Sequence, residues 1–225
     1  MIIITGIAGG IGNFLFSKFS ELGEQIIGTY HLNKPEGKLH ENTFPLDITN
    51  YDEVEKFITS IQAEKITLIN CVGLSGNAVA HKSAIEDWKN VINVNLNGAF
   101  HLIRAILPLM REQNFGRIIN LSSVVAETGV VGTSAYAASK AGLNGMIKSV
   151  ALENAQKGIT INNINLGYFN VGMIDTVPKE MQEAIKEKIA SKSFGDPENI
   201  FNTIQYIRQT SYLNGACLDL NGGLV

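Results

Sequence analysis

Tyr136 and Lys140 have side-chain types and a spacing that suit proton transfer. They stand four residues apart in a segment with helical character, so both fall on one face of the expected helix. Ser123 lies upstream, where an apolar strand ends, and a glycine-containing loop leads from it to Tyr136. A free tyrosine has a pKa of about 10, and a nearby ammonium group favours its phenolate. Together the three side chains suit proton exchange with an oxygen whose carbon gains or loses a hydride.

The spacing of this pair is weak evidence by itself, because Tyr30 and Lys34 stand the same distance apart. The earlier pair lies at a strand end with no hydroxyl partner upstream, so we interpret it as accidental. Tyr136 and Lys140 instead follow Ser123 through a strand-to-helix loop. Their role therefore depends on whether other segments bring a cofactor and a substrate to the same edge of a sheet.

A glycine-rich turn near the N-terminus predicts a cofactor site. The short apolar run 2–4 is typical of a buried strand, the turn 5–12 follows it, and a helix is predicted from Asn13 to Leu22. Glycines let a diphosphate approach the backbone closely, and the helix N-terminus offers free N–H groups. An ordinary tight turn is the alternative interpretation, and the flanking strand and helix weigh against it.

The second predicted strand, 25–30, bears on the choice between NAD and NADP. An acidic residue about 20 residues past the glycines usually binds the ribose of NAD, but this strand ends in Tyr30 and His31. The missing acid favours NADP, with His31 or Lys34 near the 2′-phosphate. Both are equally typical of a solvated loop, and the glycine turn carries no Arg or Lys. Asp47, at the next strand end, suits either local turn chemistry or a bond from the adenine amino group.

Alternation of strands and helices continues along the chain and predicts a doubly wound parallel sheet of the Rossmann type, in one domain spanning 1–225. Asn50 and Glu53 form a capping box for a helix through Ala63. The segment 168–195 is polar and carries a short amphipathic pattern, so we expect a substrate lid there, with an ordinary surface helix as the alternative. The further strands are expected at 66–73, 116–121, 159–167 and 216–220, and the further helices at 84–110, 135–154 and 197–208.

Within the helical segment 84–110, Asn93, Asn95, Asn97 and Gly98 break the local rules for a helix. Such a break indicates a functional feature or a bend. Pro108 predicts a kink near the end of the same helix. The helix 135–154 carries small residues on one side, which suit either a subunit interface or close packing on the sheet.

These motifs together resemble the short-chain dehydrogenase/reductase family, with a layout close to its 3-oxoacyl-acyl-carrier-protein reductases, over essentially the whole chain. The resemblance implies that Tyr136 is the general acid or base, that Lys140 tunes it and holds the nicotinamide ribose, that Ser123 polarises the carbonyl and that Asn95 supports a proton relay. It implies a cofactor site made by Thr5, Gly6, Gly10, Ile11, Gly12, Tyr30, His31, Asp47, Ile48, Asn70, Cys71, Gly73, Tyr136, Lys140, Gly167 and Val171. No metal site is expected.

Two positions depart from the family pattern. Leu166 stands where the family has a proline before Gly167, and Val171 stands where it has a threonine that bonds the nicotinamide carboxamide. These changes predict a weaker grip on the cofactor or an accommodating substrate site.

The predicted function is NAD(P)H-dependent reduction of a ketone, in a 3-oxoacyl thioester or another small carbonyl, with NADP as the expected cofactor and NAD as the other. A non-catalytic NAD(P)-binding regulatory protein of the same fold is the main alternative. A nucleotide-sugar enzyme of this fold generally carries a longer C-terminal portion, and a methyl-donor enzyme has no use for the Ser-Tyr-Lys set. The expected partner is a small carbonyl or alcohol substrate, either free or bound to acyl-carrier protein, and the protein is expected to be a homo-oligomer, a dimer or tetramer.

Composition argues against several other classes of partner. The chain has 225 residues, 45% of them hydrophobic, and a net charge of −3; it carries no basic run, which argues against nucleic acid. Two distant cysteines, Cys71 and Cys217, suit a reducing cytoplasm rather than a disulfide scaffold, and we expect Cys71 to be buried. No basic leader or apolar segment of bilayer length is seen, so we expect a cytoplasmic protein without a membrane span.

Overall fold

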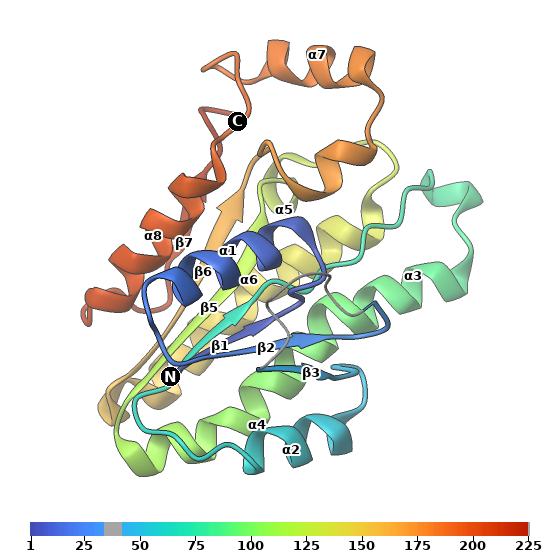
Figure 1. The fold of residues 1–225 in the computed structure, drawn as a ribbon. Coiled ribbons are helices and arrows are strands. Elements are labelled where there is room, and N and C mark those ends of the chain that lie inside the picture. The colour runs from blue at the N-terminus through green and yellow to red at the C-terminus, as the bar shows by residue number, and fades with distance from the viewer. Residues whose placement is uncertain (34–41, 225) are drawn as a thin grey trace.

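The computed structural model describes residues 1–33 and 42–224 and is built on a parallel sheet. In the order β3-β2-β1-β4-β5-β6-β7, each strand pairs in parallel with its neighbour (Figure 1). The order reverses direction between β1 and β4, and such a switch point leaves a crevice at the carboxyl ends of the strands. The predicted doubly wound sheet is confirmed. The strands are β1 (Ile2–Thr5), β2 (Ile26–Tyr30), β3 (Thr43–Pro45), β4 (Thr67–Asn70), β5 (Gly116–Ser123), β6 (Ile159–Leu166) and β7 (Cys217–Leu220).

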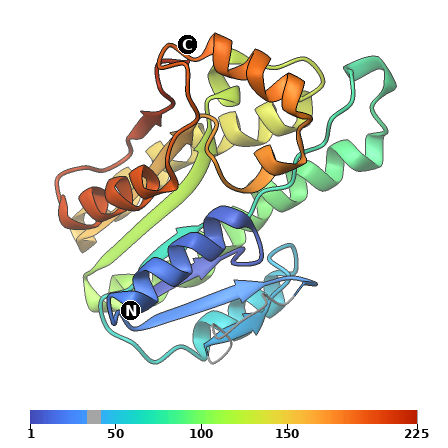
Figure 2. The same ribbon diagram turned by 45° about the horizontal axis from the view of Figure 1, so that its top comes forward.

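Helices cover both faces of the sheet, as Figures 1 and 2 show. The helices α1 (Gly10–Glu21) and α8 (Pro197–Gln209) share one apolar cluster with the strands. The helices α2 (Tyr51–Thr59), α4 (Gly98–Gln113) and α6 (Ser134–Asn154) share the cluster on the opposite face. The remaining helical elements are α3 (Ile85–Ile92), α5 (Val125–Thr128), α7 (Lys179–Lys188), the π-helix η2 (Asn93–Asn97) and the 3₁₀ turns η1 (Ala80–Lys82), η3 (Ala155–Lys157) and η4 (Gly172–Thr176).

The strands carry apolar side chains on both faces because both faces are covered. Ile3 and Ile118 point into the cluster with α2, α4 and α6, while Ile4 and Ile119 point into the cluster with α1 and α8. All four side chains are fully buried. Each such burial contributes about 1.5–3 kcal/mol, and it accounts for strand sequences without polar alternation.

Two helix boundaries differ from the sequence prediction. The first helix begins at Gly10 rather than Asn13, since Gly9 serves as its N-cap and the turn is already complete there; glycine's low helix propensity hid this start. The helix capped by Asn50 ends at Thr59 rather than Ala63. The hydroxyl groups of Thr59 and Ser60 donate to carbonyls of the preceding turn, and such bonds compete with continuation of a helix.

The other expected elements differ less. The irregular asparagine segment is the π-helix η2, which interrupts the path from α3 to α4. Pro108 lies inside α4, but the helix continues to Gln113 rather than ending near the proline. The loop after β5 contains the unpredicted short helix α5, which ends at Gly129 with φ 66°.

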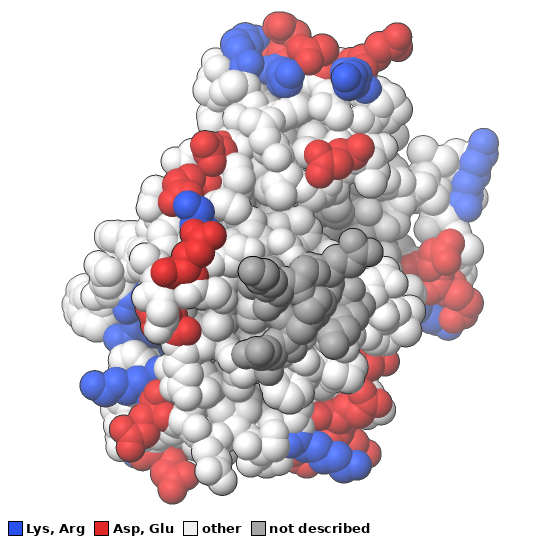
Figure 3. All heavy atoms as spheres, in the orientation of Figure 1, with Lys and Arg blue, Asp and Glu red and all other residues white. Residues whose placement is uncertain are grey.

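Among the described residues of the face drawn in Figure 3, acidic and basic side chains lie mainly toward the margins. Within the described residues, no helix combines the length and the apolar character that crossing a bilayer requires.

Candidate active site

The end of β5 and the first turns of α6 bring Ser123, Tyr136 and Lys140 together. The Ser123 hydroxyl lies close enough to Tyr136 to lower the pKa of the tyrosine. The Nζ atom of Lys140 donates to the carbonyl of Leu121 at 2.8 Å and lies 5.6 Å from the centre of the Tyr136 ring. Ser123, Tyr136 and Lys140 are all buried. The three residues that the sequence singled out therefore form one cluster at the carboxyl end of β5.

Burial sets the ionisation of this cluster. It raises the pKa of Tyr136 above its usual value, and the nearby Ser123 hydroxyl partly opposes that rise, while Tyr168 adds to it. Burial also lowers the pKa of Lys140 to about 8. Since a buried ammonium and a buried phenolate are both costly, each group is biased toward its neutral form.

The two serines at the end of β5 have different partners. Ser122 donates to the carbonyl of Lys140 at 3.4 Å, on the side of α6. The hydroxyl of Ser123 accepts from the backbone N–H of Val125 at 3.2 Å and lies near Tyr136, whose pKa it lowers. Ser123 is thus the serine that contacts the tyrosine.

Asn95 lies in the π-helix η2, and its side chain bonds the backbone of Leu74 in the segment after β4. Its Oδ1 accepts from the N–H of Leu74 at 2.7 Å, and its Nδ2 donates to the carbonyl of Leu74 at 2.9 Å. The same Nδ2 donates to Ser139 Oγ at 3.0 Å, and Ser139 donates in turn to the carbonyl of Tyr136 at 2.7 Å. Asn95 is 1% exposed. Its side chain therefore links the end of β4 to the turn of α6 that carries Tyr136.

The glycine turn is folded tightly against the start of α1. Gly6 has φ 75°, and a Cβ on Gly12 would lie only 2.3 Å from the Gly6 carbonyl oxygen. Thr5 donates to Asn70 Oδ1 at 2.9 Å, which joins the ends of β1 and β4. The turn and Ile11 are thereby fixed at the N-terminus of α1, a place suited to an anion.

A cavity of about 360 Å³ opens beside this turn at the carboxyl ends of β1, β2 and β4. It includes the predicted cofactor residues Gly6, Tyr30, His31, Asp47, Ile48, Cys71 and Gly73. It also includes residues that the sequence did not single out, namely Ala8, Gly9, Thr29, Leu46, Thr49, Val72, Asn90 and Val94. Ala8 and Gly9 lie within the predicted turn 5–12, and Thr29, Leu46, Thr49 and Val72 lie at or just after strand ends, whereas Asn90 and Val94 lie in α3 and η2 and had no signal in the sequence. Cys71 is half-buried rather than sealed in the core, and burial raises the pKa of its thiol to about 12.

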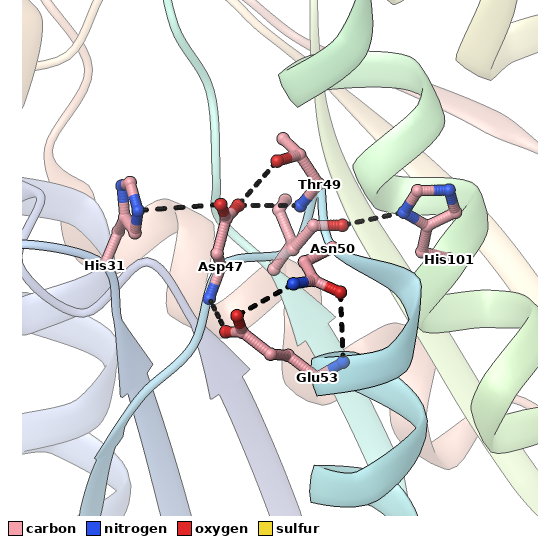
Figure 4. Close-up of polar contacts among 7 residues, drawn as sticks. His31, Asp47, Thr49, Asn50, Glu53 and His101 are labelled. Atoms are coloured by element: carbon pink, nitrogen blue, oxygen red, sulfur yellow. Dashed lines mark hydrogen bonds and ion pairs between the residues drawn. The ribbon is translucent and has the colours of Figure 1, made fainter.

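Asp47 forms the polar side of this cavity (Figure 4). Its Oδ1 accepts from the N–H and the hydroxyl of Thr49, at 2.9 and 2.7 Å. Its Oδ2 lies 3.8 Å from His31 Nε2. Partial burial acts to raise the pKa of Asp47, but the bonds from Thr49 and the nearby His31 outweigh it, so the net pKa is lowered. Asp47 thus combines the turn role with an ionised carboxylate at the cavity wall; Lys34 lies outside the described residues.

The predicted capping box next to Asp47 is present in altered form. Glu53 N–H donates to Asn50 Oδ1 at 3.3 Å, and Asn50 Nδ2 donates to Glu53 Oε1 at 2.9 Å. Glu53 Oε2 accepts from the backbone of Asp47 rather than from that of Asn50. Behind this turn His101 contacts the carbonyl of Ile48 at 2.9 Å (Figure 4). These bonds therefore hold the backbone N–H of Asp47 and the carbonyl of Ile48, two residues that line the cavity.

The segment after β6 meets the glycine turn. A Cβ on Gly10 would lie 2.7 Å from Gly172 Cα and 2.9 Å from Val171 Cγ2. Gly73 lies beside Lys140, since a Cβ there would be 3.6 Å from the Nζ atom. Gly167 donates its N–H to the carbonyl of Leu220. Gly10 thus meets the segment after β6, while Gly73, which lines the cavity, lies beside Lys140.

Sequence reasoning missed the C-terminal tail. Gly222 accepts a backbone bond from Ser191 N–H at 3.0 Å. Leu224 packs against the apolar cluster that contains Tyr136 and also against the cluster of Ile174, Ile189 and Phe194 in the segment 168–195. Both ribbon views place the C-terminus beside that segment (Figures 1 and 2). The only available signal was the pair Gly222 and Gly223, which both have positive φ.

The sheet is doubly wound, and a glycine turn follows β1 at its switch point. A serine, a tyrosine and a lysine meet at the carboxyl end of β5. This combination is typical of a Rossmann-type oxidoreductase. The family profile described as short chain dehydrogenase matches residues 1–182. The chain belongs to this family and is an NAD(P)-dependent dehydrogenase/reductase, as the sequence predicted.

Similar proteins cover nearly the whole chain. It is 34% identical to the 3-oxoacyl-acyl-carrier-protein reductase FabG of Rickettsia bellii, over 99% of this chain and 95% of that protein. It is 32% identical to the enzyme of the same name from Thermotoga maritima, over 99% and 96%. It is 30% identical to the acetoacetyl-CoA reductase of Allochromatium vinosum, over 99% and 97%.

Proposed function

We propose that this protein reduces the ketone of a 3-oxoacyl thioester to an alcohol, with Tyr136 as the proton donor. The observation that carries the proposal is the placement of Ser123 beside Tyr136, with Lys140 Nζ 5.6 Å from the centre of the same ring. This arrangement offers a carbonyl oxygen two hydroxyl groups from one side. Proton transfer from a positioned group is worth about 10²–10⁴-fold in rate.

The residues around the cavity and the glycine turn fit a dinucleotide. The crowded turn between Gly6 and Gly12 would admit a diphosphate at the N-terminus of α1. The cavity bounded by Asp47 and Ile48 suits an adenosine group, with the Asp47 carboxylate available to the adenine amino group. The crevice continues past Gly73 toward Lys140. When bound, the reduced nicotinamide supplies the hydride.

Each side chain then has a distinct role. Ser123 would donate to the carbonyl oxygen and stabilise the charge that develops on it. Tyr136 would give its proton to that oxygen, and the ammonium of Lys140 would stabilise the phenolate left behind. Asn95 would support the relay by holding the end of β4 against the turn of Tyr136. Because burial raises the pKa of Tyr136, the tyrosine is protonated at neutral pH and is ready to act as an acid.

NADPH is the cofactor we propose. Strand β2 ends in Tyr30 and His31 without a carboxylate, and among the described cavity residues Asp47 alone carries one. His31 would lie near the 2′-phosphate of the ribose. His31→Asp is expected to shift the ratio of kcat/KM toward NADH, because an acid binds the free 2′-hydroxyl and repels the phosphate. An unchanged ratio would remove His31 from this role.

The similarity to a 3-oxoacyl-acyl-carrier-protein reductase and to an acetoacetyl-CoA reductase supports a 3-oxoacyl thioester as the substrate. We further propose that the segment 168–195 is the substrate lid. Its apolar residues Ile174, Ile189 and Phe194 form a cluster of their own, and Leu224 connects it to the Tyr136 cluster. A single domain acting in the cytoplasm as a homo-oligomer, a dimer or tetramer, completes the proposal; light scattering would measure the oligomeric state.

The test is NADPH oxidation with acetoacetyl-CoA as the probe substrate, alongside simple ketones and an acetoacetylated acyl-carrier protein. Turnover is expected for the wild type. Tyr136→Phe is expected to abolish turnover while its NADPH dissociation constant stays unchanged. If Tyr136→Phe turns over as fast as the wild type, the assignment is wrong.

A further inference from the structure

A row of buried amide side chains crosses the sheet at one level. Thr5 pairs in register with Asn70, Asn70 with Asn120, and Asn120 with Asn163. Their side chains are linked by hydrogen bonds of 2.9, 3.5 and 3.0 Å in the same order. Burying polar groups is costly unless they are bonded, so a row of this length calls for a reason beyond packing.

The row turns toward the proposed catalytic residues at its far end. Asn163 Nδ2 donates to Asn144 Oδ1 on α6 at 2.8 Å, and Asn144 Nδ2 donates to Asn165 Oδ1 at 3.1 Å. Asn144 lies four residues after Lys140, which itself lies four residues after Tyr136. Successive steps of four stay close to one face of a helix. Asn144, which bonds both Asn163 and Asn165, therefore joins the row to the face of α6 that carries Tyr136 and Lys140.

The row ends at Asn165, and both the nitrogen and the oxygen of its side-chain amide form hydrogen bonds. Its Nδ2 donates to Glu127 Oε1 at 3.2 Å and to Asp219 Oδ1 at 2.9 Å, while its Oδ1 accepts from Asn144. The residue is fully buried. Only an amide can accept from Asn144 and also donate to two carboxylates. An aspartate at this position would put a third negative charge beside Glu127 and Asp219.

The partners of Asn165 belong to the elements that carry the reacting groups. Glu127 lies on α5, four residues after Ser123, and Asn144 lies on α6 with Tyr136 and Lys140. In the sheet ladder Asn165 pairs with Ser122, the neighbour of Ser123. One buried amide thus ties the element that follows Ser123 and the helix that carries Tyr136 to β6 and β7.

We propose that Asn165 is a positioning residue, which acts with Glu127 and Asn144 to hold Ser123 at bonding distance from Tyr136. The proposal rests on the proposed function, because it assigns Asn165 a role through those two residues. Loss of the link would let α5 shift relative to α6. A misplacement of about 1 Å at a reacting group can cost about 100-fold in rate.

The test compares Asn165→Ala and Glu127→Ala with two matched controls. Asn162→Ala removes an equally buried amide of the same strand, which faces the other side and bonds Leu213 and Ala216 instead. Glu127→Gln keeps an oxygen that can accept from Asn165. Glu127 is exposed, so Glu127→Ala keeps the test available even if Asn165→Ala does not fold.

The measurements are kcat for acetoacetyl-CoA across pH, the NADPH dissociation constant and the melting temperature. Asn165→Ala and Glu127→Ala are expected to lower kcat about tenfold or more, with unchanged NADPH affinity. The Tyr136 step of their alkaline limb, which lies above the Lys140 step near pH 8, should move to higher pH, because Tyr136 loses the nearby serine hydroxyl that lowers its pKa. Glu127→Gln should restore both values, and Asn162→Ala should lower only the melting temperature.

Three outcomes would overturn the proposal: an unmoved alkaline limb in both alanine variants, an equal shift in Asn162→Ala, or no recovery with Glu127→Gln. Tyr136→Phe in the same assay separates this result from the proposed function. If Tyr136→Phe is inactive while Asn165→Ala is fully active, only the role of Asn165 fails. If Tyr136→Phe is active, the catalytic assignment itself fails.

Discussion

Asn95 and Leu74 close a ring of two hydrogen bonds, with Leu74 N–H donating to Oδ1 at 2.7 Å and Nδ2 donating to the Leu74 carbonyl at 2.9 Å. The ring fastens the segment after β4 to the π-helix, and the further bond to Ser139 carries it to α6. A π-helical turn is less favourable than continuous α-helix and is frequent at functional sites. The two bonds to Leu74 therefore stabilise the π-helical turn through a contact with a segment distant in sequence.

Asn95→Ala should therefore lower both stability and turnover. It leaves both backbone groups of Leu74 without their partner, and the free energy of unfolding should fall by roughly 2–4 kcal/mol. Urea denaturation and NADPH oxidation would measure the two effects. Asn97→Ala is the control, since the exposed Asn97 bonds only Asn93 among the described residues. Equal losses in the two variants would contradict the role of the ring.

Ser123→Ala should move the alkaline limb of ketone reduction to higher pH. Ser123 lowers the pKa of Tyr136, so its removal raises that pKa, and the protonated tyrosine persists to higher pH. The earlier fall in turnover near pH 8, where Lys140 loses its proton, should stay in place, and only the later fall due to Tyr136 should move. Turnover should also fall by about 10²–10³-fold, since one donor to the carbonyl oxygen is lost.

Ser122→Ala is the matched control for this experiment, because Ser122 is buried next to Ser123 but bonds the carbonyl of Lys140. The pH profile of kcat would be recorded for both variants. A limb that moves in Ser122→Ala and stays in place in Ser123→Ala would reverse the assignment of the two serines.

Lys140→Met should be inactive but more stable than the wild type at pH 7. Burial lowers the pKa of Lys140 from 10.5 to about 8. Below pH 8 both the folded and the unfolded chain hold the proton, so the folded state bears the full cost of the buried ammonium, about 3 kcal/mol. Loss of the bond to Leu121 offsets about 1 kcal/mol, which leaves a gain of about 2 kcal/mol.

The stability gain of Lys140→Met should shrink as the pH rises from 8 to 10.5. In that range the folded wild type releases the proton while the unfolded chain keeps it, so the wild type becomes more stable relative to the variant. Urea denaturation of both proteins at several pH values would measure the difference. A difference that is constant across this range would show that Lys140 is not destabilised by its burial.

The fold and the Ser123, Tyr136 and Lys140 cluster were predictable because their determinants are local. Strand β5, its loop and α6 are continuous in sequence, so the spacing from Ser123 to Tyr136 already fixes which side chains meet. The asparagines of η2 signalled an irregular helix by breaking the local rules. Helix ends were less predictable, since the end at Thr59 depends on side-chain bonds back to the preceding turn.

Contacts between distant segments were not predictable from this sequence. Asn165 looks like any polar residue in a strand, and its partners Glu127 and Asp219 come from separate elements. No sequence pattern predicts the packing of Leu224 or the approach of Gly172 to Gly10. Such contacts are defined only once the sheet order is known.

Gly10→Ala should weaken NADPH binding by displacing the segment after β6. Its Cβ would lie 2.7 Å from the backbone of Gly172, a contact that requires the backbone to move. Gly145→Ala is the control, because a Cβ in that part of α6 meets open space, and alanine should stabilise the helix by about 0.5–1 kcal/mol. Fluorescence titration with NADPH and thermal melting would compare them. Unchanged NADPH affinity in Gly10→Ala would show that this contact does not shape the site.

Val171→Thr should tighten NADPH binding. Val171 has an extended backbone, with φ −160° and ψ 144°, and its Cγ2 atom lies next to Gly10 at the start of α1. Valine and threonine have nearly the same shape, so the substitution adds a hydroxyl donor beside the proposed cofactor path without a change in packing volume. One new hydrogen bond is worth about 0.5–1.5 kcal/mol, which corresponds to roughly a two- to tenfold lower dissociation constant. Fluorescence titration of both proteins with NADPH would measure the change, and an equal affinity would contradict the idea that Val171 weakens the hold on the nicotinamide.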